Sequence, residues 1–116
     1  MSFKKLNFNE TEVVTILGGP IRIFFTEETV GTKELMFVMG DFAPGEGLDP
    51  HAHDDPLQDE VYYCISGNGT VWWGEDEKET SIGPGDALFI PKGVHHYVKN
   101  TGNERLIIAF FLAPGR

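Results

Sequence analysis

All four histidines of the sequence lie in two short clusters, His51-Ala52-His53 and His95-His96. Each cluster lies in a strand-like segment that is bounded by glycine and proline. Imidazole is the commonest protein ligand of transition metals, and the side chains of two separate strands can converge on one point. The two clusters therefore predict a shared metal site.

The alternation of side chains along a strand indicates which histidines could share the metal. Successive residues face opposite sides, so His51 and His53 lie on one side, about 7 Å apart along the strand. In the second cluster His96 shares a face with the apolar Val94, whereas His95 lies on the opposite, more polar face. We therefore predict His96 as the inward ligand and His95 as a surface histidine or a group beside the ligands. The ordinary alternative for His51 and His53 is a pair of exposed or hydrogen-bonded imidazoles without a metal.

A carboxylate from a third segment could complete the site. Glu60 begins an aromatic strand, on which Glu60, Tyr62 and Cys64 share a face that could line a cavity. The alternative for Glu60 is an exposed carboxylate at the start of a strand. The acidic residues nearer to His53 lie beside Pro56 in a segment with the character of a loop: Asp54, Asp55 and Asp59.

The two clusters lie inside two longer patterns, Gly45-x5-His51-x-His53-x6-Glu60-x6-Gly67 and Gly85-x5-Pro91-x-Gly93-x2-His96-x3-Asn100. These patterns closely resemble the paired motifs of the cupin superfamily, small β-barrels that hold one metal on three histidines and one glutamate. The resemblance, to a single-domain cupin with a cupin type 2 barrel, covers residues 45–100 directly, and the flanking strands extend it to nearly the whole chain. It implies four metal ligands: His51, His53, Glu60 and His96. It also implies that four residues serve backbone geometry in turns: Gly67, Gly85, Pro91 and Gly93.

The sequence departs from the family pattern between His53 and Glu60. Six residues separate them, more than is usual in the family. Because Glu60 heads the aromatic strand, we interpret the extra residues as a longer loop at the mouth of the pocket. Asp59 and Gln58 remain alternatives to Glu60 as the fourth ligand.

The elements that must position these residues are short strands. Fourteen glycines and seven prolines leave pieces rich in β-branched and aromatic residues, and no segment has apolar residues at helical spacing over three turns. We predict strands over residues 21–25, 34–42, 60–66, 70–73, 87–90, 94–99 and 105–112, and a hairpin at Gly67-Asn68-Gly69. The fold class is all-β, a sandwich or barrel, and the resemblance implies the cupin-type double-stranded β-helix, or jelly roll.

Composition limits the partners and the location of the protein. Eighteen acidic and nine basic residues give a formal charge of −9, which disfavours nucleic acid and anionic membranes as partners. Lys4 and Lys5 are not followed by the apolar stretch of a signal peptide, and the single Cys64 suits a reducing compartment. We therefore expect a cytoplasmic protein, with Cys64 as a small buried apolar residue rather than a nucleophile.

The chain is expected to form one cupin domain over residues 1–116, with residues 1–15 as an N-terminal arm and the metal-site motifs at 45–67 and 85–100. Residues 107–112 are apolar on both faces of a predicted strand, as in a central or intersubunit strand. Small cupins commonly associate through such strands, and we expect a homodimer.

Three imidazoles and one carboxylate suit Fe(II), Mn(II), Ni(II), Co(II), Zn(II) or Cu(II) without choosing among them. Four protein ligands would leave positions open for water, dioxygen or a substrate oxygen. The first hypothesis is a metal-dependent enzyme for a small organic substrate, by resemblance a dioxygenase, otherwise an isomerase, lyase or decarboxylase, with Tyr62 as the candidate donor beside the metal. The second is a metal-dependent module that binds or senses a small molecule without turnover. The third, a metal-free storage-like cupin, would require degraded ligand positions, and these are intact.

Overall fold

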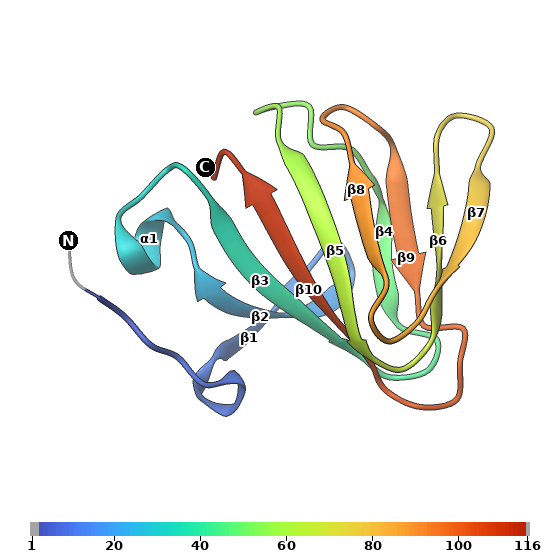
Figure 1. The fold of residues 1–116 in the computed structure, drawn as a ribbon, viewed down its shortest axis with the longest axis horizontal. Coiled ribbons are helices and arrows are strands. Elements are labelled where there is room, and N and C mark those ends of the chain that lie inside the picture. The colour runs from blue at the N-terminus through green and yellow to red at the C-terminus, as the bar shows by residue number, and fades with distance from the viewer. Residues whose placement is uncertain (1–2, 116) are drawn as a thin grey trace.

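Ten strands make up most of the computed structural model, which describes residues 3–115. Their bounds are β1 Glu12–Ile16, β2 Gly19–Phe25, β3 Met36–Phe42, β4 Gly47–His51, β5 Asp59–Ser66, β6 Gly69–Trp73, β7 Lys78–Ile82, β8 Ala87–Ile90, β9 His96–Lys99 and β10 Leu106–Ala113. They form a six-stranded sheet in the order β1-β2-β3-β10-β5-β8 and a four-stranded sheet in the order β4-β9-β6-β7. All pairings are antiparallel, and the two sheets face each other as the layers of a jelly roll (Figure 1). The predicted all-β class is confirmed.

The core lies between the two sheets because each strand turns alternate side chains inward. On β10, Leu106, Ile108, Phe110 and Leu112 are buried in it. β10 pairs with β3 on one side and with β5 on the other. The apolar segment 107–112 is therefore a central strand, one of the two roles that its composition predicts.

The connection at Gly67-Asn68-Gly69 corrects one prediction, because it is not a hairpin. It joins β5 of the larger sheet to β6 of the smaller, so the chain crosses between layers here. Gly67 has φ of +84°, and a Cβ on it would lie 2.2 Å from the carbonyl oxygen of Arg105. Only glycine fits this corner, for reasons of both conformation and space.

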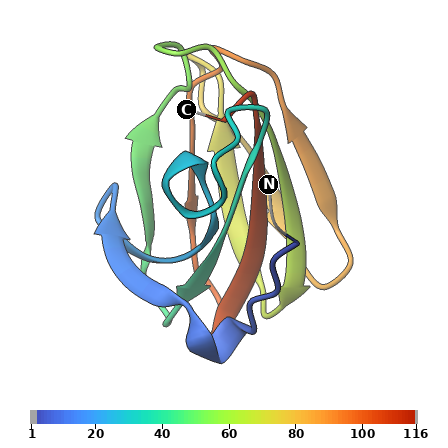
Figure 2. The same cartoon turned by 90° about the vertical axis from the view of Figure 1, so that its left-hand side faces the viewer.

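The predicted arm of residues 1–15 is shorter than expected, because β1 begins at Glu12 and pairs with β2. Asn7 caps a 3₁₀ turn over Phe8–Glu10, and Leu6 and Phe8 pack on the outer face of the larger sheet. In Figure 2 this dark blue segment runs beside the red strand β10.

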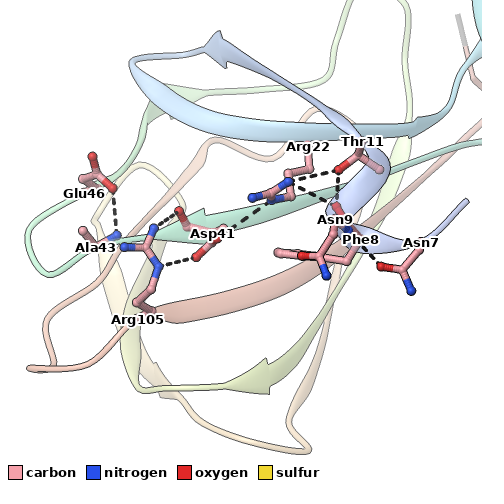
Figure 3. Close-up of polar contacts among 9 residues, drawn as sticks. All are labelled: Asn7, Phe8, Asn9, Thr11, Arg22, Asp41, Ala43, Glu46 and Arg105. Carbon is pink, nitrogen blue, oxygen red and sulfur yellow. Dashed lines mark hydrogen bonds and ion pairs between the residues drawn. The ribbon is translucent and has the colours of Figure 1, made fainter.

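Arg22 on β2 attaches the arm to the sheet (Figure 3). Its Nη1 donates to the carbonyl oxygen of Phe8 at 3.1 Å, and its guanidinium carbon lies 4.2 Å from the centre of the Phe8 ring. Asp41 lies between Arg22, at 3.8 Å, and Arg105, whose Nε donates to the carboxylate at 2.7 Å. The contacts of Arg22 thus connect the arm with two neighbouring strands.

Helix is a minor component, as predicted: α1, the α-helix among the described residues, spans only Glu27–Val30 and ends at Gly31, which has φ of +83°. Within residues 3–115 there is no helix of the length and apolar character that a membrane crossing requires.

Candidate metal centre

Four side chains from both sheets meet at one end of the space between the layers. His51 ends β4, His96 begins β9 beside it, His53 follows β4, and Glu60 lies at the start of β5 in the facing sheet. One ligating atom from each residue lies within 4.8 Å of every other. The structure thus brings together the four residues that the motifs imply.

Strand pairing places the histidine at the end of β4 opposite the histidine at the start of β9. His51 is the register partner of His96, and their ring centres are 4.3 Å apart. His53 lies outside the strand, since β4 ends at His51, which corrects the prediction of one continuous strand for both. Its backbone is fixed differently: its carbonyl oxygen accepts hydrogen bonds from the N–H groups of Gln58 at 3.1 Å and Gly93 at 3.3 Å.

Backbone carbonyl groups orient two of the three imidazoles. Nδ1 of His51 donates to the oxygen of Asp49 at 2.7 Å, and Nδ1 of His96 donates to the oxygen of Val94 at 2.8 Å. A carbonyl oxygen only accepts, so Nδ1 of both rings carries the proton. In the neutral rings Nε2 then presents a lone pair, the arrangement in which metal-binding histidines are held.

Glu60 faces these nitrogens in a way that calls for a cation. Its Oε1 lies 3.0 Å from Nε2 of His96 and 3.1 Å from Nε2 of His53. The His53 nitrogen is buried and has no hydrogen-bond partner among the described residues. With a neutral His96 whose Nδ1 carries the proton, the lone pair of Nε2 faces a carboxylate oxygen, and a shared cation removes this repulsion. Ligand bonds of about 2.1 Å need only small shifts from the observed spacing, so the residues fit a transition metal.

The surroundings favour the charge states that a metal requires. Burial, followed by the neighbouring His96 and His53, lowers the pKa of His51 to about 4, although its bond to Asp49 opposes the shift. Burial acts to raise the pKa of the Glu60 carboxyl, but His53 and His96 together outweigh it, and the pKa lies below its usual value. At neutral pH, His51 is thus an uncharged ligand and Glu60 an anionic one.

The structure separates these four residues from their alternatives. The His95 side chain is exposed, as predicted from strand alternation. Asp59 accepts a hydrogen bond from the backbone N–H of Lys92 at 2.9 Å. Gln58 lies nearby, and its amide nitrogen donates to the oxygen of Pro114 at 2.9 Å.

Tyr62 lies deeper in the core than the predicted donor role requires. Its ring centre is 6.0 Å from that of His96 and 4.6 Å from that of Phe110. Burial, and then the charge of Glu60, raise the pKa of its hydroxyl well above the usual value. The hydroxyl makes no hydrogen bond to any described residue, so it donates neither to Glu60 nor to the histidines in this structure.

A cavity of about 420 Å³ opens beside the four residues. Its polar wall contains His51, His53, Glu60 and Gln58, and the loop residues Asp55 and Pro56 stand at its side, where the longer loop was predicted. The remaining wall is apolar: Ile16, Leu17, Ile21, Met36, Val38, Leu48, Ala52, Phe110 and Leu112. Sequence reasoning missed Ile16 and Leu17, which lie at the tip of the β1–β2 hairpin; the Gly18-Gly19-Pro20 turn between two β-branched runs was the available signal.

The family model described as Cupin domain matches residues 38–112. Among curated proteins, the tetracenomycin polyketide synthase protein TcmJ of Streptomyces glaucescens is 30% identical over 97 residues, 84% of this chain and 62% of that protein. Protein SchB of Streptomyces halstedii is 31% identical over 97 residues, 84% of this chain and 67% of that protein. The matches therefore span about three fifths to two thirds of the length of these relatives.

Solved structures have the same fold. A predicted oxalate decarboxylase from Thermotoga maritima superposes with a TM-score of 0.80 at 24% identity, over 96% of this chain and 99% of that one. KdgF from a Halomonas species superposes with a TM-score of 0.75 at 22% identity, over 93% and 92% of the two chains. These likenesses concern the fold, since both identities are low.

Proposed function

Because the chain belongs to the cupin family, we propose that it is a single-metal enzyme that acts on a small, mainly apolar organic molecule. In this proposal residues 1–116 form one cupin domain, with its metal-site motifs at 45–67 and 85–100. The observation that carries the proposal is the convergence of four ligating side chains, within 4.8 Å of one another, at the wall of a cavity.

The proposed metal ligands are His51, His53, Glu60 and His96. A bound transition metal would supply a Lewis acid or a redox centre for oxygen-containing groups. The residues themselves prepare this site: carbonyl groups hold the Nδ1 protons of His51 and His96, and Glu60 supplies negative charge. The donor set is compatible with Fe, Mn, Ni, Co, Zn or Cu.

The cavity supports the proposed class of substrate. Its volume of about 420 Å³ is within the range of small-molecule sites, and most of its wall is apolar. Side chains such as Ile21, Val38 and Phe110 would hold the hydrocarbon part of a molecule and exclude water, while its oxygen atoms face His51 and Glu60. Two relatives that are named for polyketide synthases, TcmJ and CurC of Streptomyces cyaneus, support a polyketide-like or aromatic substrate.

The reaction we favour is a dioxygenation, and the alternatives are isomerisation, lyase chemistry and decarboxylation. A module that binds the same molecules without turnover is the second candidate function. It is favoured by the absence, among the described residues, of a protein acid or base in the cavity wall other than His51, His53, Glu60 and Asp55.

We also propose a homodimer, formed by the outer face of the six-stranded sheet. Phe37, Phe111, Val61 and Phe89 are consecutive register partners across β3, β10, β5 and β8, so they form one apolar row. Phe111 and Phe89 are 48% and 64% exposed. Large exposed apolar side chains in a continuous row are typical of an interface.

Two measurements test the enzyme proposal. Elemental analysis of protein purified without added metal is expected to give about one transition metal per chain, and less than about a tenth of this would contradict it. Oxygen-electrode assays with diketone, flavonol and phenolic substrates are then expected to record oxygen uptake. Uptake with none of them, in protein that contains metal, would place the lyase, isomerase and binding alternatives ahead.

A further inference from the structure

Gln58 contributes a buried amide to the wall of the cavity. The metal site formed by the four clustered residues does not explain why this amide is there. Gln58 is 4% exposed and lies two residues before Glu60, on the same face of the chain. A buried carboxamide is costly unless both its donor and its acceptor find partners. The partners of Gln58 therefore indicate what the site is built to receive.

The orientation of the amide is fixed by its neighbours. Nε2 donates to the carbonyl oxygen of Pro114 at 2.9 Å and lies 3.9 Å from Sδ of Met36. Both neighbours are acceptors, so a rotated amide would place its oxygen against another oxygen. The backbone N–H of Gln58 is fixed too, by its bond to the oxygen of His53 at 3.1 Å.

The amide oxygen is left as an acceptor beside the cavity. Within residues 3–115 no side chain or backbone group donates to Oε1 of Gln58, and the Gln58 side chain lies in the cavity wall together with the apolar Met36 and Leu112. An acceptor held in this way favours a neutral donor and repels an anionic oxygen. Among the described residues, the wall also contains no lysine or arginine that would hold a carboxylate.

We infer that Gln58 binds the substrate, with Oε1 accepting a hydrogen bond from a hydroxyl group of the molecule in the cavity. This inference rests on the proposed function, and it narrows the substrate class to hydroxylated, mainly apolar molecules such as phenols and enols. It separates the substrate of this protein from a small dicarboxylate, which has no hydroxyl donor at neutral pH and no apolar part for the walls.

Two probes that differ only in the donor test this inference: 2-naphthol and 2-methoxynaphthalene. Calorimetric titrations use the protein as purified and after removal of metal by a chelator, because the hydroxyl could also bind a metal. In both forms 2-naphthol is expected to bind about five- to tenfold more tightly, the effect of one hydrogen bond. In Gln58→Met the ratio is expected to fall to about one, with the affinity for 2-methoxynaphthalene unchanged.

Leu112→Met is the matched control, because it alters the same wall without removing the acceptor or either group that orients the Gln58 amide, and it should keep the ratio. Thermal unfolding and metal content establish that Gln58→Met is folded with an intact metal centre. An unchanged ratio in this variant, or no binding of 2-naphthol to the wild-type protein, would overturn the inference. Absence of metal or of turnover would instead contradict the proposed function. It would not change the ratio of the affinities for the two probes in the metal-free protein, so the two failures can be distinguished.

Discussion

His95 and His96 are adjacent in sequence, yet the backbone gives them different chemistry. His96 is turned inward, is 1% exposed and has its Nδ1 fixed by the oxygen of Val94. His95 is exposed to solvent. This adjacent pair therefore offers an internal comparison. Replacing His96 removes an imidazole from the metal centre, and replacing His95 removes one from the surface.

His96→Ala is expected to lower the metal content of the purified protein by at least tenfold, because one of four ligands and the fixed lone pair are lost. His95→Ala is expected to retain the wild-type content, since its side chain is exposed and is not one of the four clustered residues. Elemental analysis of both variants, purified side by side, measures the difference. Equal losses in the two variants would contradict the assignment of faces on β9.

Cys64 illustrates how burial suppresses chemistry. Its side chain is in the core, and burial, followed by the charge of Asp86, raises the pKa of its thiol above the usual value. The sulfur lies 3.5 Å from the oxygen of Ser66, to which it can donate. The neutral thiol is therefore the form that the fold favours, as the sequence predicted for a small apolar residue.

The native protein is expected to react slowly with a thiol-specific reagent at pH 8, and unfolding in denaturant is expected to speed the reaction more than tenfold. Since the folded pKa is raised, the contribution of Cys64 to stability is complete below the unfolded pKa and falls as the pH rises through the folded one. Time courses of labelling from pH 7 to pH 9 measure the reaction rates of the thiol in the native and in the unfolded protein. Equally fast labelling of native and unfolded protein would show an accessible thiolate and would contradict the burial.

At the scale of elements, the sequence predicted the strands whose composition is strongly apolar and missed three others. β4 contains Pro50, which is uncommon within a sheet, so the strand-like segment predicted at His51 was not extended back to Gly47. β7 is mainly polar, because it lies at the edge of the smaller sheet. Strand alternation identified His96 correctly, but for His51 and His53 it assumed a strand that in fact ends at His51. The motif spacing, which does not depend on that strand, also included His53. Sheet membership has no local signal, which is why the corner at Gly67 was mistaken for a hairpin.

The N-terminal arm depends on a small number of contacts, which makes it a suitable element to test. Arg22→Met keeps the length of the side chain but removes the hydrogen bond to the oxygen of Phe8, which is drawn in Figure 3, and the contact with the Phe8 ring. Hydrogen exchange in residues 6–11 is expected to speed up, and the free energy of unfolding to fall by about 1 kcal/mol. Arg105→Met, which alters the same cluster around Asp41 without touching the arm, is the control. Faster exchange in both variants would contradict a role of Arg22 in holding the arm.

At the scale of the whole molecule, apolar surface and net charge act in opposite directions. Leu6 and Phe8 of the arm cover part of the outer face of the larger sheet. The apolar row from Phe37 to Phe89 extends past the covered part, and Phe89 is exposed. Against this attraction, each chain carries a formal charge of −9, so two copies repel each other at long range. An association through the row is therefore expected to strengthen as salt screens the charge.

Sedimentation equilibrium of the wild-type protein at micromolar concentration is expected to give the mass of two chains, with tighter association at 0.5 M than at 0.05 M salt. Phe89→Glu places a charge in the row, at a side chain that is 64% exposed in one chain, and is expected to give the mass of one. Leu57→Glu is the control, because Leu57 is 51% exposed but lies in the loop between His53 and Glu60 and is not a member of the row. A wild-type monomer, or a Phe89→Glu dimer with unchanged affinity, would contradict association through this face. Loss of the dimer in both variants would also contradict it, since the charge added is the same and the effect would then not depend on its position in the row.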